Sequence, residues 1–117
     1  MRDFRKYMVW ELGHKITKEI YKLTATFPDS EKFGLISQMR RASSSVPANI
    51  AEGCGRNSDK EFRRFLFIAN GSATELEYFL ILSKELNFWE HHTDYDIDDQ
   101  VNKLKRSLNK LINSISE

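Results

Sequence analysis

The sequence predicts an all-α protein that folds as an antiparallel up-down-up-down four-helix bundle. Apolar residues recur at the helical spacing of three and four along four stretches, and no stretch alternates apolar and polar residues as a strand would. The connections between these stretches are short, which favours antiparallel neighbours. A chain of 117 residues fits one domain with one core. We expect that domain to span residues 1–117, with helices at about 8–25, 30–53, 59–87 and 95–115.

The first two helices are separated by Pro28, which ends the first apolar run. The apolar stripe of the first helix consists of Val9, Leu12, Ile16, Ile20 and Leu23. Asp29 or Ser30 is placed to cap the second helix, because their side-chain oxygens accept hydrogen bonds from free N–H groups. The inward face of the second helix is predicted to contain Leu35, Met39, Ala42, Val46, Ile50 and Gly53.

Pro47 lies inside the predicted second helix. It removes the hydrogen bond to the Ser43 carbonyl and disfavours helical geometry at Val46, so we expect a kink near Pro47. The hydroxyls of residues 43–45 are placed to satisfy the freed backbone groups locally. A functional hinge at this position is the alternative interpretation.

The third helix begins at a capping box, with Ser58 as the N-cap and Glu61 three residues later. Its apolar positions are Phe62, Phe65, Leu66, Ala69, Ala73, Leu76, Phe79, Leu80 and Leu86. The fourth helix has a heptad-like seam of Ile97, Val101, Leu104, Leu108, Leu111 and Ile115.

The second and third helices carry too little charge to be exposed on a full face. Between Lys32 and Glu52 the charged residues are Arg40 and Arg41, and residues 65–74 contain none, although 30% of the chain is charged. A helix that is apolar or small on most sides is normally buried on most sides. We therefore predict that the chain forms a homo-oligomer through these two helices.

A polar stripe runs beside the apolar face of the second helix. Its members recur at spacings of 3, 4, 4 and 3, and they are Gln38, Arg41, Ser45, Asn49 and Glu52. Arg41 and Glu52 are too far apart to pair within one helix, so we expect their partners on another helix or subunit, where they would fix register. A solvated stripe is the alternative.

Composition indicates a soluble cytoplasmic protein. The chain has a formal net charge of +1, a single cysteine that excludes an internal disulfide, and no uncharged run of about 18 residues that would span a membrane. Residues 1–64 hold 13 Lys and Arg against 8 Asp and Glu, whereas residues 65–117 hold 5 against 9. This asymmetry indicates either a basic face or two helices that pack against two oppositely charged ones.

The sequence offers no recognisable catalytic or metal-binding pattern, so we expect a non-enzymatic protein without cofactor or metal. His14, His91 and His92 lack ligand spacing. The acids from Asp94 to Asp99 lack the glycine and glutamate of a calcium loop and instead suit a helix N-terminus. Cys54 follows a helix and has no histidine nearby in sequence to activate it.

Basic residues gather where the third helix begins. The cluster consists of Arg56, Lys60, Arg63 and Arg64, with Arg40 on the second helix as a further candidate. Repeated around a symmetric assembly, such cations would bind a phosphate backbone without reading its bases. Glu52 and Glu61 lie among them, so solvated or ion-paired arginines are the other interpretation.

Two segments of the chain, QMRRASSSVPANIAEGCGR and SDKEFRRFLFIANGSATELE, form a recognisable pattern that extends to Trp10, Phe27-Pro28 and Gly34-Leu35. In this pattern the chain resembles the 23S rRNA-intervening-sequence protein family. Residues that fall on its signature are Arg40, Arg41, Asn49, Glu52, Gly53, Gly55 and Arg56.

The resemblance implies a bacterial four-helix bundle that assembles as a ring-like homopentamer. A related branch, the accessory variability determinant of diversity-generating retroelements, works with a reverse transcriptase and nucleic acid. We therefore expect a homo-oligomeric scaffold or adaptor that binds a protein partner, such as a reverse transcriptase. The alternative is a sequence-nonspecific RNA- or DNA-binding accessory protein.

Overall fold

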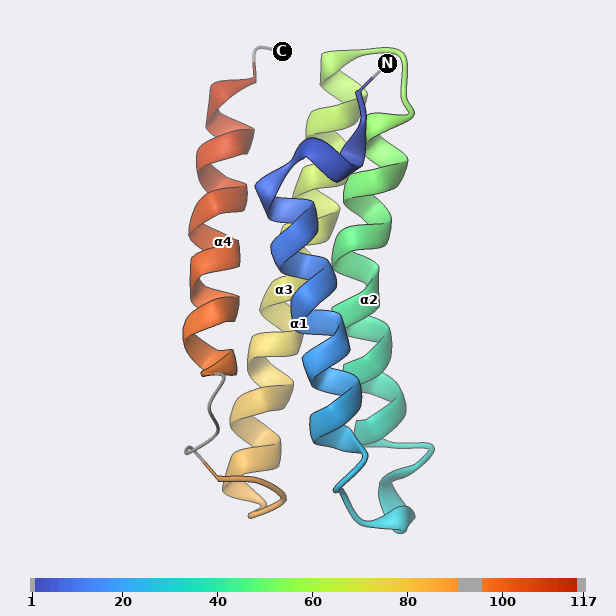
Figure 1. Cartoon of the computed structure of the whole chain (residues 1–117), viewed down its shortest axis with the longest axis vertical. Helices are drawn as coiled ribbons and strands as arrows, with labels where there is room; N and C mark the ends of the chain where they lie inside the picture. Colours follow the sequence, from blue (N-terminus) through green and yellow to red (C-terminus); the bar gives the residue numbers. More distant parts are fainter. Residues whose placement is uncertain (1, 91–95, 116–117) are drawn as a thin grey trace.

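The structure, a computed structural model, describes residues 2–90 and 96–115 (Figure 1). Four α-helices account for most of them: α1 (Met8–Thr24), α2 (Leu35–Cys54), α3 (Asp59–Glu85) and α4 (Ile97–Ser114). Two short 3₁₀ helices, η1 (Phe4–Lys6) and η2 (Asp29–Glu31), precede α1 and α2. The described residues contain no strand, and the predicted all-α class is confirmed.

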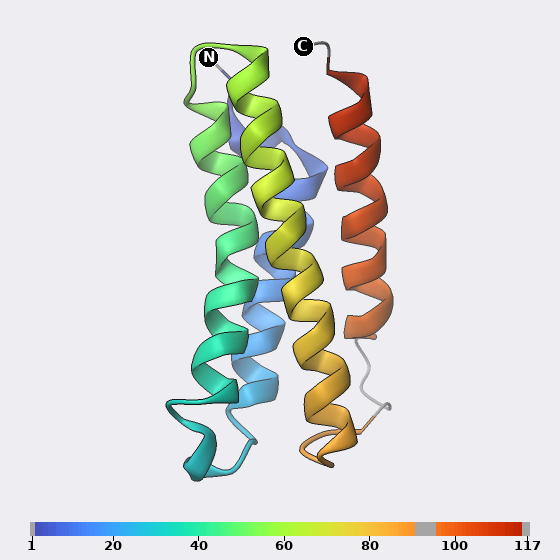
Figure 2. The same ribbon diagram turned by 180° about the vertical axis from the view of Figure 1, so that it is seen from behind.

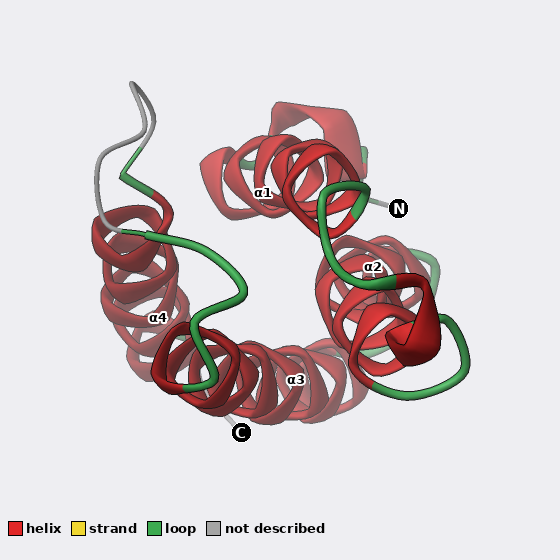
Figure 3. Ribbon diagram, turned by 90° about the horizontal axis from the view of Figure 1, so that it is seen from below, coloured by secondary structure: helices red, strands yellow, loops and turns green. Residues whose placement is uncertain are grey.

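Successive helices run in opposite directions and form one bundle that measures 43 × 25 × 20 Å. Viewed end-on, α1, α2, α3 and α4 follow one another around the core (Figure 3). α2 packs most extensively against α3 and next against α1, whereas α4 contacts α3 and α1 over fewer residues. α2 and α3 therefore lie side by side along one long side of the bundle, which faces the viewer in Figure 2.

The core is built from the apolar stripes that the sequence predicts. Ile16, Met39, Leu66 and Leu104 are examples of fully buried residues, one from each helix. The predictions are less accurate at helix ends. Leu86, predicted as an inward position, is exposed and lies just beyond the end of α3. On α4 the last buried position is Ile112 and Leu111 is half-buried, since a 3.6-residue helix drifts away from a strict heptad.

α1 and α2 approach each other closely at Gly13. A Cβ atom placed on Gly13 would lie 3.2 Å from Val46 Cγ1 and 3.5 Å from Pro47 Cδ. The missing side chain therefore lets the proline ring of α2 bury itself against α1. α2 runs through Pro47 without interruption, and the kink stays a prediction.

The backbone group that Pro47 leaves unpaired is satisfied from α1. The Thr17 hydroxyl lies 3.0 Å from the Ser43 carbonyl oxygen and 2.9 Å from that of Gly13, so its proton is shared between them. The expectation that the hydroxyls of residues 43–45 would do this was wrong. Those of Ser43 and Ser44 donate instead to carbonyls three residues earlier, because a hydroxyl on a helix reaches back toward the preceding turn.

α2 begins at Leu35, five residues later than predicted, because residues 29–31 form the separate 3₁₀ helix η2. Neither Asp29 nor Ser30 caps α2. The Glu31 carboxylate accepts a hydrogen bond from the Leu35 N–H at 3.3 Å and takes that role. The cap of α3 is as predicted, since Ser58 Oγ accepts from the Glu61 N–H at 3.1 Å.

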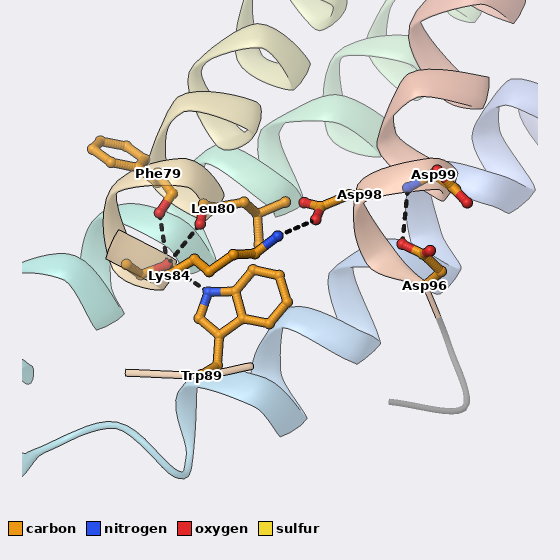
Figure 4. Close-up of polar contacts among 8 residues, drawn as sticks. Phe79, Leu80, Lys84, Trp89, Asp96, Asp98 and Asp99 are labelled. Carbon is orange, nitrogen blue, oxygen red and sulfur yellow. Dashed lines mark hydrogen bonds and ion pairs between the residues drawn. The ribbon is translucent and has the colours of Figure 1, made fainter. Parts of the chain in front are cut away.

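α3 ends at a left-handed residue, Asn87, which has a φ of 64°. The Asn87 N–H donates to the Lys84 carbonyl at 2.9 Å and the Phe88 N–H to the Ser83 carbonyl at 3.0 Å, which is the Schellman pattern. The turn brings Trp89 back under α3, where its Nε1 donates to Ser83 Oγ at 2.9 Å (Figure 4). This buried contact fixes the end of α3 from which the chain continues to α4.

Candidate functional site

The polar stripe of α2 is divided by the fold. In its middle, Asn49 Nδ2 donates to the Ser45 carbonyl at 2.8 Å and to Ser45 Oγ at 3.0 Å. Ser45 Oγ in turn lies 2.9 Å from Ser72 Oγ of α3. These residues therefore join α2 to α3 within one subunit.

The ends of the stripe are exposed. Gln38, Arg41 and Glu52 point away from the core, and Glu52 lies 3.9 Å from Arg56 Nη2. Between Arg41 and Glu52, the outer side of α2 carries small or short side chains, which are Ser44, Ser45, Ala48, Asn49 and Ala51. No charged residue interrupts them.

The outer side of α3 next to it carries large apolar side chains. Phe67, Ile68, Tyr78 and Ile81 are 50%, 39%, 56% and 51% exposed. Gly71 lies among them with nothing within 4 Å of a Cβ placed on it, so the surface is open there. These five residues and the five short ones of α2 make up a surface that we call the α2–α3 face, and exposed Glu75 lies within it between Gly71 and Tyr78.

α3 is also the one described helix that is long and apolar enough to cross a membrane, with a mean hydropathy of 1.2 over its most apolar window. One third of that window is buried inside the bundle. The core helix of a water-soluble bundle can satisfy the same criterion, because its inward side is apolar throughout.

A row of polar residues on α3 faces α4 at seven-residue spacing. Arg63 Nε donates to the Ile112 carbonyl at 3.2 Å, and the Glu77 and Lys84 side chains pair with Lys105 and Asp98 at 2.8 and 2.7 Å. Asn70, also in this row, has its Oδ1 buried without a partner among the described residues. This row was not predicted, although its seven-residue spacing is visible in the sequence.

The basic cluster at the start of α3 is largely paired. Arg64 donates two hydrogen bonds to the Glu61 carboxylate, at 3.0 and 3.2 Å, and these lower the pKa of Glu61. The guanidinium groups of Arg56 and Arg64 lie 4.8 and 4.6 Å from the centre of the Phe65 ring. Arg63 is half-buried and directed toward α4, as described above.

Carboxylates balance the charge that remains in this cluster. Arg56, Lys60 and Arg64 are exposed, but Glu52 and Glu61 pair with two of them. The neighbouring Asp59 pairs with Arg2. The surface around the cluster therefore alternates in sign and is not a continuous positive patch.

Arg40 lies apart from this cluster. Sixteen residues separate it from Arg56, which corresponds to about 24 Å along a helix. Its Nε donates to Thr24 Oγ1 at 2.9 Å, and its guanidinium group lies 4.5 Å from the centre of the Tyr21 ring. Arg40 therefore ties α2 to the C-terminal end of α1.

A second basic surface, which was not predicted from the sequence, lies on α4. From Asn102 to Asn113 every exposed residue of this helix is Asn, Lys or Arg. We call this surface the α4 basic face, and it consists of Asn102, Lys103, Arg106, Asn109, Lys110 and Asn113.

Among the described residues, no three His, Cys, Asp or Glu side chains come together as a metal site would require. Cys54 is buried, and burial raises the pKa of its thiol, which disfavours the reactive thiolate. His14 stacks on Trp10 with ring centres 5.0 Å apart. His91, His92 and Asp94 lie outside the described residues, whereas Asp96 caps α4 by accepting from the Asp99 N–H at 3.2 Å.

The fold is similar to that of a crystal structure described as a protein with unknown function from the S23 ribosomal protein family of Bacteroides thetaiotaomicron. The TM-score is 0.81, the sequences are 24% identical, and the match covers 90% of this chain and 95% of that chain. At this identity the likeness concerns the fold alone. No curated protein matches the sequence.

The profile of a family described as 23S rRNA-intervening sequence protein matches residues 5–110. This match extends from η1 through most of α4 and includes every contact between helices described above except those at Ile112. The chain belongs to the 23S rRNA-intervening sequence protein family.

Proposed function

We propose that this chain is a cytoplasmic, non-enzymatic scaffold whose subunits associate through the α2–α3 face. The observation that carries the proposal is the group of apolar side chains on α3, each between 39% and 56% exposed, beside the open position at Gly71. Contiguous exposed apolar side chains of this kind are typical of surfaces that another protein covers. The absence of charge along both helices in this region favours the same interpretation.

The two halves of the α2–α3 face differ in shape, which favours contact between unlike halves. The α3 half presents large side chains such as Phe67 and Tyr78, whereas the α2 half presents short ones such as Ala48. Large side chains of one subunit fit against the short ones of the next. Such a head-to-tail contact generates a ring when its rotation closes, and the family resemblance implies five copies.

The charges that border the uncharged stretches of α2 and α3 support a ring in which all subunits point the same way. Ser45 and Ser72 lie side by side, so they mark a common level on α2 and α3. Counting from this level along the two antiparallel helices at about 1.5 Å per residue, Arg41 lies within one residue of the level of Glu75, and Glu52 within one residue of the level of Arg64. Rotation about an axis parallel to the bundle would therefore bring α2 of one subunit beside α3 of the next with opposite charges together at both ends of the uncharged stretches.

The assembled ring would act by holding a protein partner, such as a reverse transcriptase, on several equivalent subunits. The alternative of nucleic-acid binding by Arg56, Lys60, Arg63 and Arg64 has less support, because carboxylates or the Ile112 carbonyl engage the three arginines. Multivalent presentation strengthens binding without new contacts, provided that the geometry lets several sites engage at once.

Sedimentation velocity at micromolar concentration tests the assembly. The Ile68→Lys variant places a charge in the centre of the face and should sediment as a folded monomer, whereas the wild-type protein should sediment as an oligomer. Met8→Lys is the matched control, because Met8 is 56% exposed but lies on α1, and it should leave the assembly unchanged. A monomeric wild-type protein would refute the proposal, and so would an Ile68→Lys variant that assembles normally.

A further inference from the structure

The α4 basic face differs from ordinary solvated helix faces in having cations without carboxylates. The sequence from Gln100 to Ser114 contains no Asp or Glu. Lys103, Arg106 and Lys110 are exposed, and none of them forms an ion pair with another residue of the described ranges 2–90 and 96–115. The remaining cation of this segment, Lys105, is paired with Glu77. The positive charge on the outer side of α4 is therefore uncompensated by its neighbours.

The three cations lie in one line. They are three and four residues apart, which places them on the same side of the helix over about 10 Å of its length. Asn102, Asn109 and Asn113 flank this line and are also exposed. The side-chain amide of asparagine donates hydrogen bonds but adds no charge, and such groups contact phosphate and sugar oxygens in nucleic-acid complexes.

α1 extends the positive charge beyond α4. Lys103 and Lys15 line the same shallow groove between the two helices, which has a volume of about 190 Å³. Lys18 and Lys22 continue from Lys15 along the outer side of α1, where Glu19 pairs with Lys22 at 3.5 Å. Glu11 is the one acidic residue that lines this groove.

The α4 basic face has the chemistry of a surface for phosphates. A protein partner normally needs apolar or aromatic side chains that insert into its surface, and the exposed positions of α4 from Asn102 to Asn113 hold none. Lys and Arg side chains in a row neutralise successive phosphates of one strand. Viewed end-on, α1 and α4 lie on the side of the bundle opposite α2 and α3, so a ring closed through the α2–α3 face would leave this surface outside (Figure 3).

We propose that the α4 basic face binds the sugar-phosphate backbone of RNA or DNA without reading base sequence. Lys103, Arg106 and Lys110 neutralise phosphates, and the flanking asparagines donate hydrogen bonds to phosphate and sugar oxygens. The proposal goes beyond the assembly function and does not depend on it, because every isolated subunit carries the complete surface.

Fluorescence anisotropy with a fluorescein-labelled RNA of mixed sequence and about 20 nucleotides tests this proposal. Binding of a single strand by three cations predicts that the dissociation constant rises roughly 20-fold when salt increases from about 50 to 200 mM. The triple variant K103Q/R106Q/K110Q should lose most of the binding at low salt together with its salt dependence. Glutamine keeps the helix propensity of these positions, and circular dichroism checks that the variant is folded.

The matched control is the triple variant R56Q/K60Q/R64Q, which removes the same charge from the paired cluster at the start of α3 and should bind RNA within a few-fold of wild type. The proposal is overturned if the wild-type protein does not bind RNA at low salt, or if K103Q/R106Q/K110Q binds RNA as tightly as wild type. It is also overturned if only R56Q/K60Q/R64Q loses RNA binding. Binding of polyglutamate in preference to RNA would also overturn it and would identify an acidic protein as the partner. The K103Q/R106Q/K110Q variant should sediment like wild type, which separates this test from that of the assembly.

Discussion

The α2–α3 face and the α4 basic face are exposed surfaces of the same bundle with opposite compositions. The first has apolar and short side chains without charge between Arg64 and Glu75 on α3, and the second has cations and amides without any apolar side chain. Burial in the core requires only one stripe on each helix, so the outer side of each helix is free to differ. The two surfaces of this small bundle therefore suit two different kinds of partner.

The largest expected effect comes from damaging the two halves of the α2–α3 face separately. Ala48→Trp fills the short half on α2, and Phe67→Asp charges the large half on α3. Each variant alone should lose the ring. Mixed in equal amounts, they should form a heterodimer, because the intact α3 half of one fits the intact α2 half of the other. Native mass spectrometry distinguishes the two chains by mass.

If the two variants are both folded but form no heterodimer when mixed, the head-to-tail arrangement is wrong. The matched control is a mixture of Met8→Lys with the wild-type protein, which should give statistically mixed rings of full size.

An intermediate effect, on the free energy of unfolding, is expected when either of two glycines in different surroundings is replaced by alanine. A Cβ atom on Gly53 would lie 2.8 Å from Phe65 Cβ, so Gly53→Ala should lower the free energy of unfolding by about 1–3 kcal/mol. Gly71 has open space, and Gly71→Ala in the monomeric Ile68→Lys background should raise it by about 0.5–1 kcal/mol. Urea denaturation measures both. Equal effects of the two substitutions would contradict the assignment of Gly53 to the interior and Gly71 to the outer face.

The smallest expected effect on assembly comes from the charges that border the uncharged stretches of α2 and α3. Arg41→Glu should weaken assembly several-fold, because an exposed ion pair contributes about 0.2–1 kcal/mol and each ring repeats it at every junction. Adding Glu75→Arg should restore the wild-type concentration dependence of assembly in sedimentation experiments. Lack of rescue would show that Arg41 and Glu75 of neighbouring subunits do not meet, and it would reject the common orientation of the subunits.

Most of the fold was predictable because periodic burial leaves a periodic pattern. The stripes on α1 and α2 and the cap at Ser58 follow from local sequence, and each was found where expected. The start of α2 was not predictable in this way. Residues 29–31 form the short 3₁₀ helix η2, and the Glu31 carboxylate, instead of Asp29 or Ser30, accepts from the first N–H of α2. Short 3₁₀ turns are frequent before α-helices, so the same residues are compatible with either kind of start.

The surfaces were harder to predict, for physical reasons that differ between them. Inside the bundle, the hydrogen-bond donor to the Ser43 carbonyl was not predictable from local sequence either, because it is Thr17 on α1, 26 residues away. The α4 basic face was hidden because residues 65–117 carry a net negative charge, to which acids of α3, of the segment before α4 and of the first turn of α4 contribute. Charge summed over half a chain does not report the charge of one helix face. The cluster of Arg56, Lys60, Arg63 and Arg64 was visible in sequence, but its pairing with carboxylates and a carbonyl required the structure.

The central claim is that the α2–α3 face is covered by another copy of the chain. The mass of the wild-type protein, measured by native mass spectrometry from a micromolar solution, tests this claim most directly. We predict one closed species whose mass is a whole multiple of the 13.7 kDa subunit, five-fold for the ring that the family resemblance implies. A species at the subunit mass alone would contradict the claim.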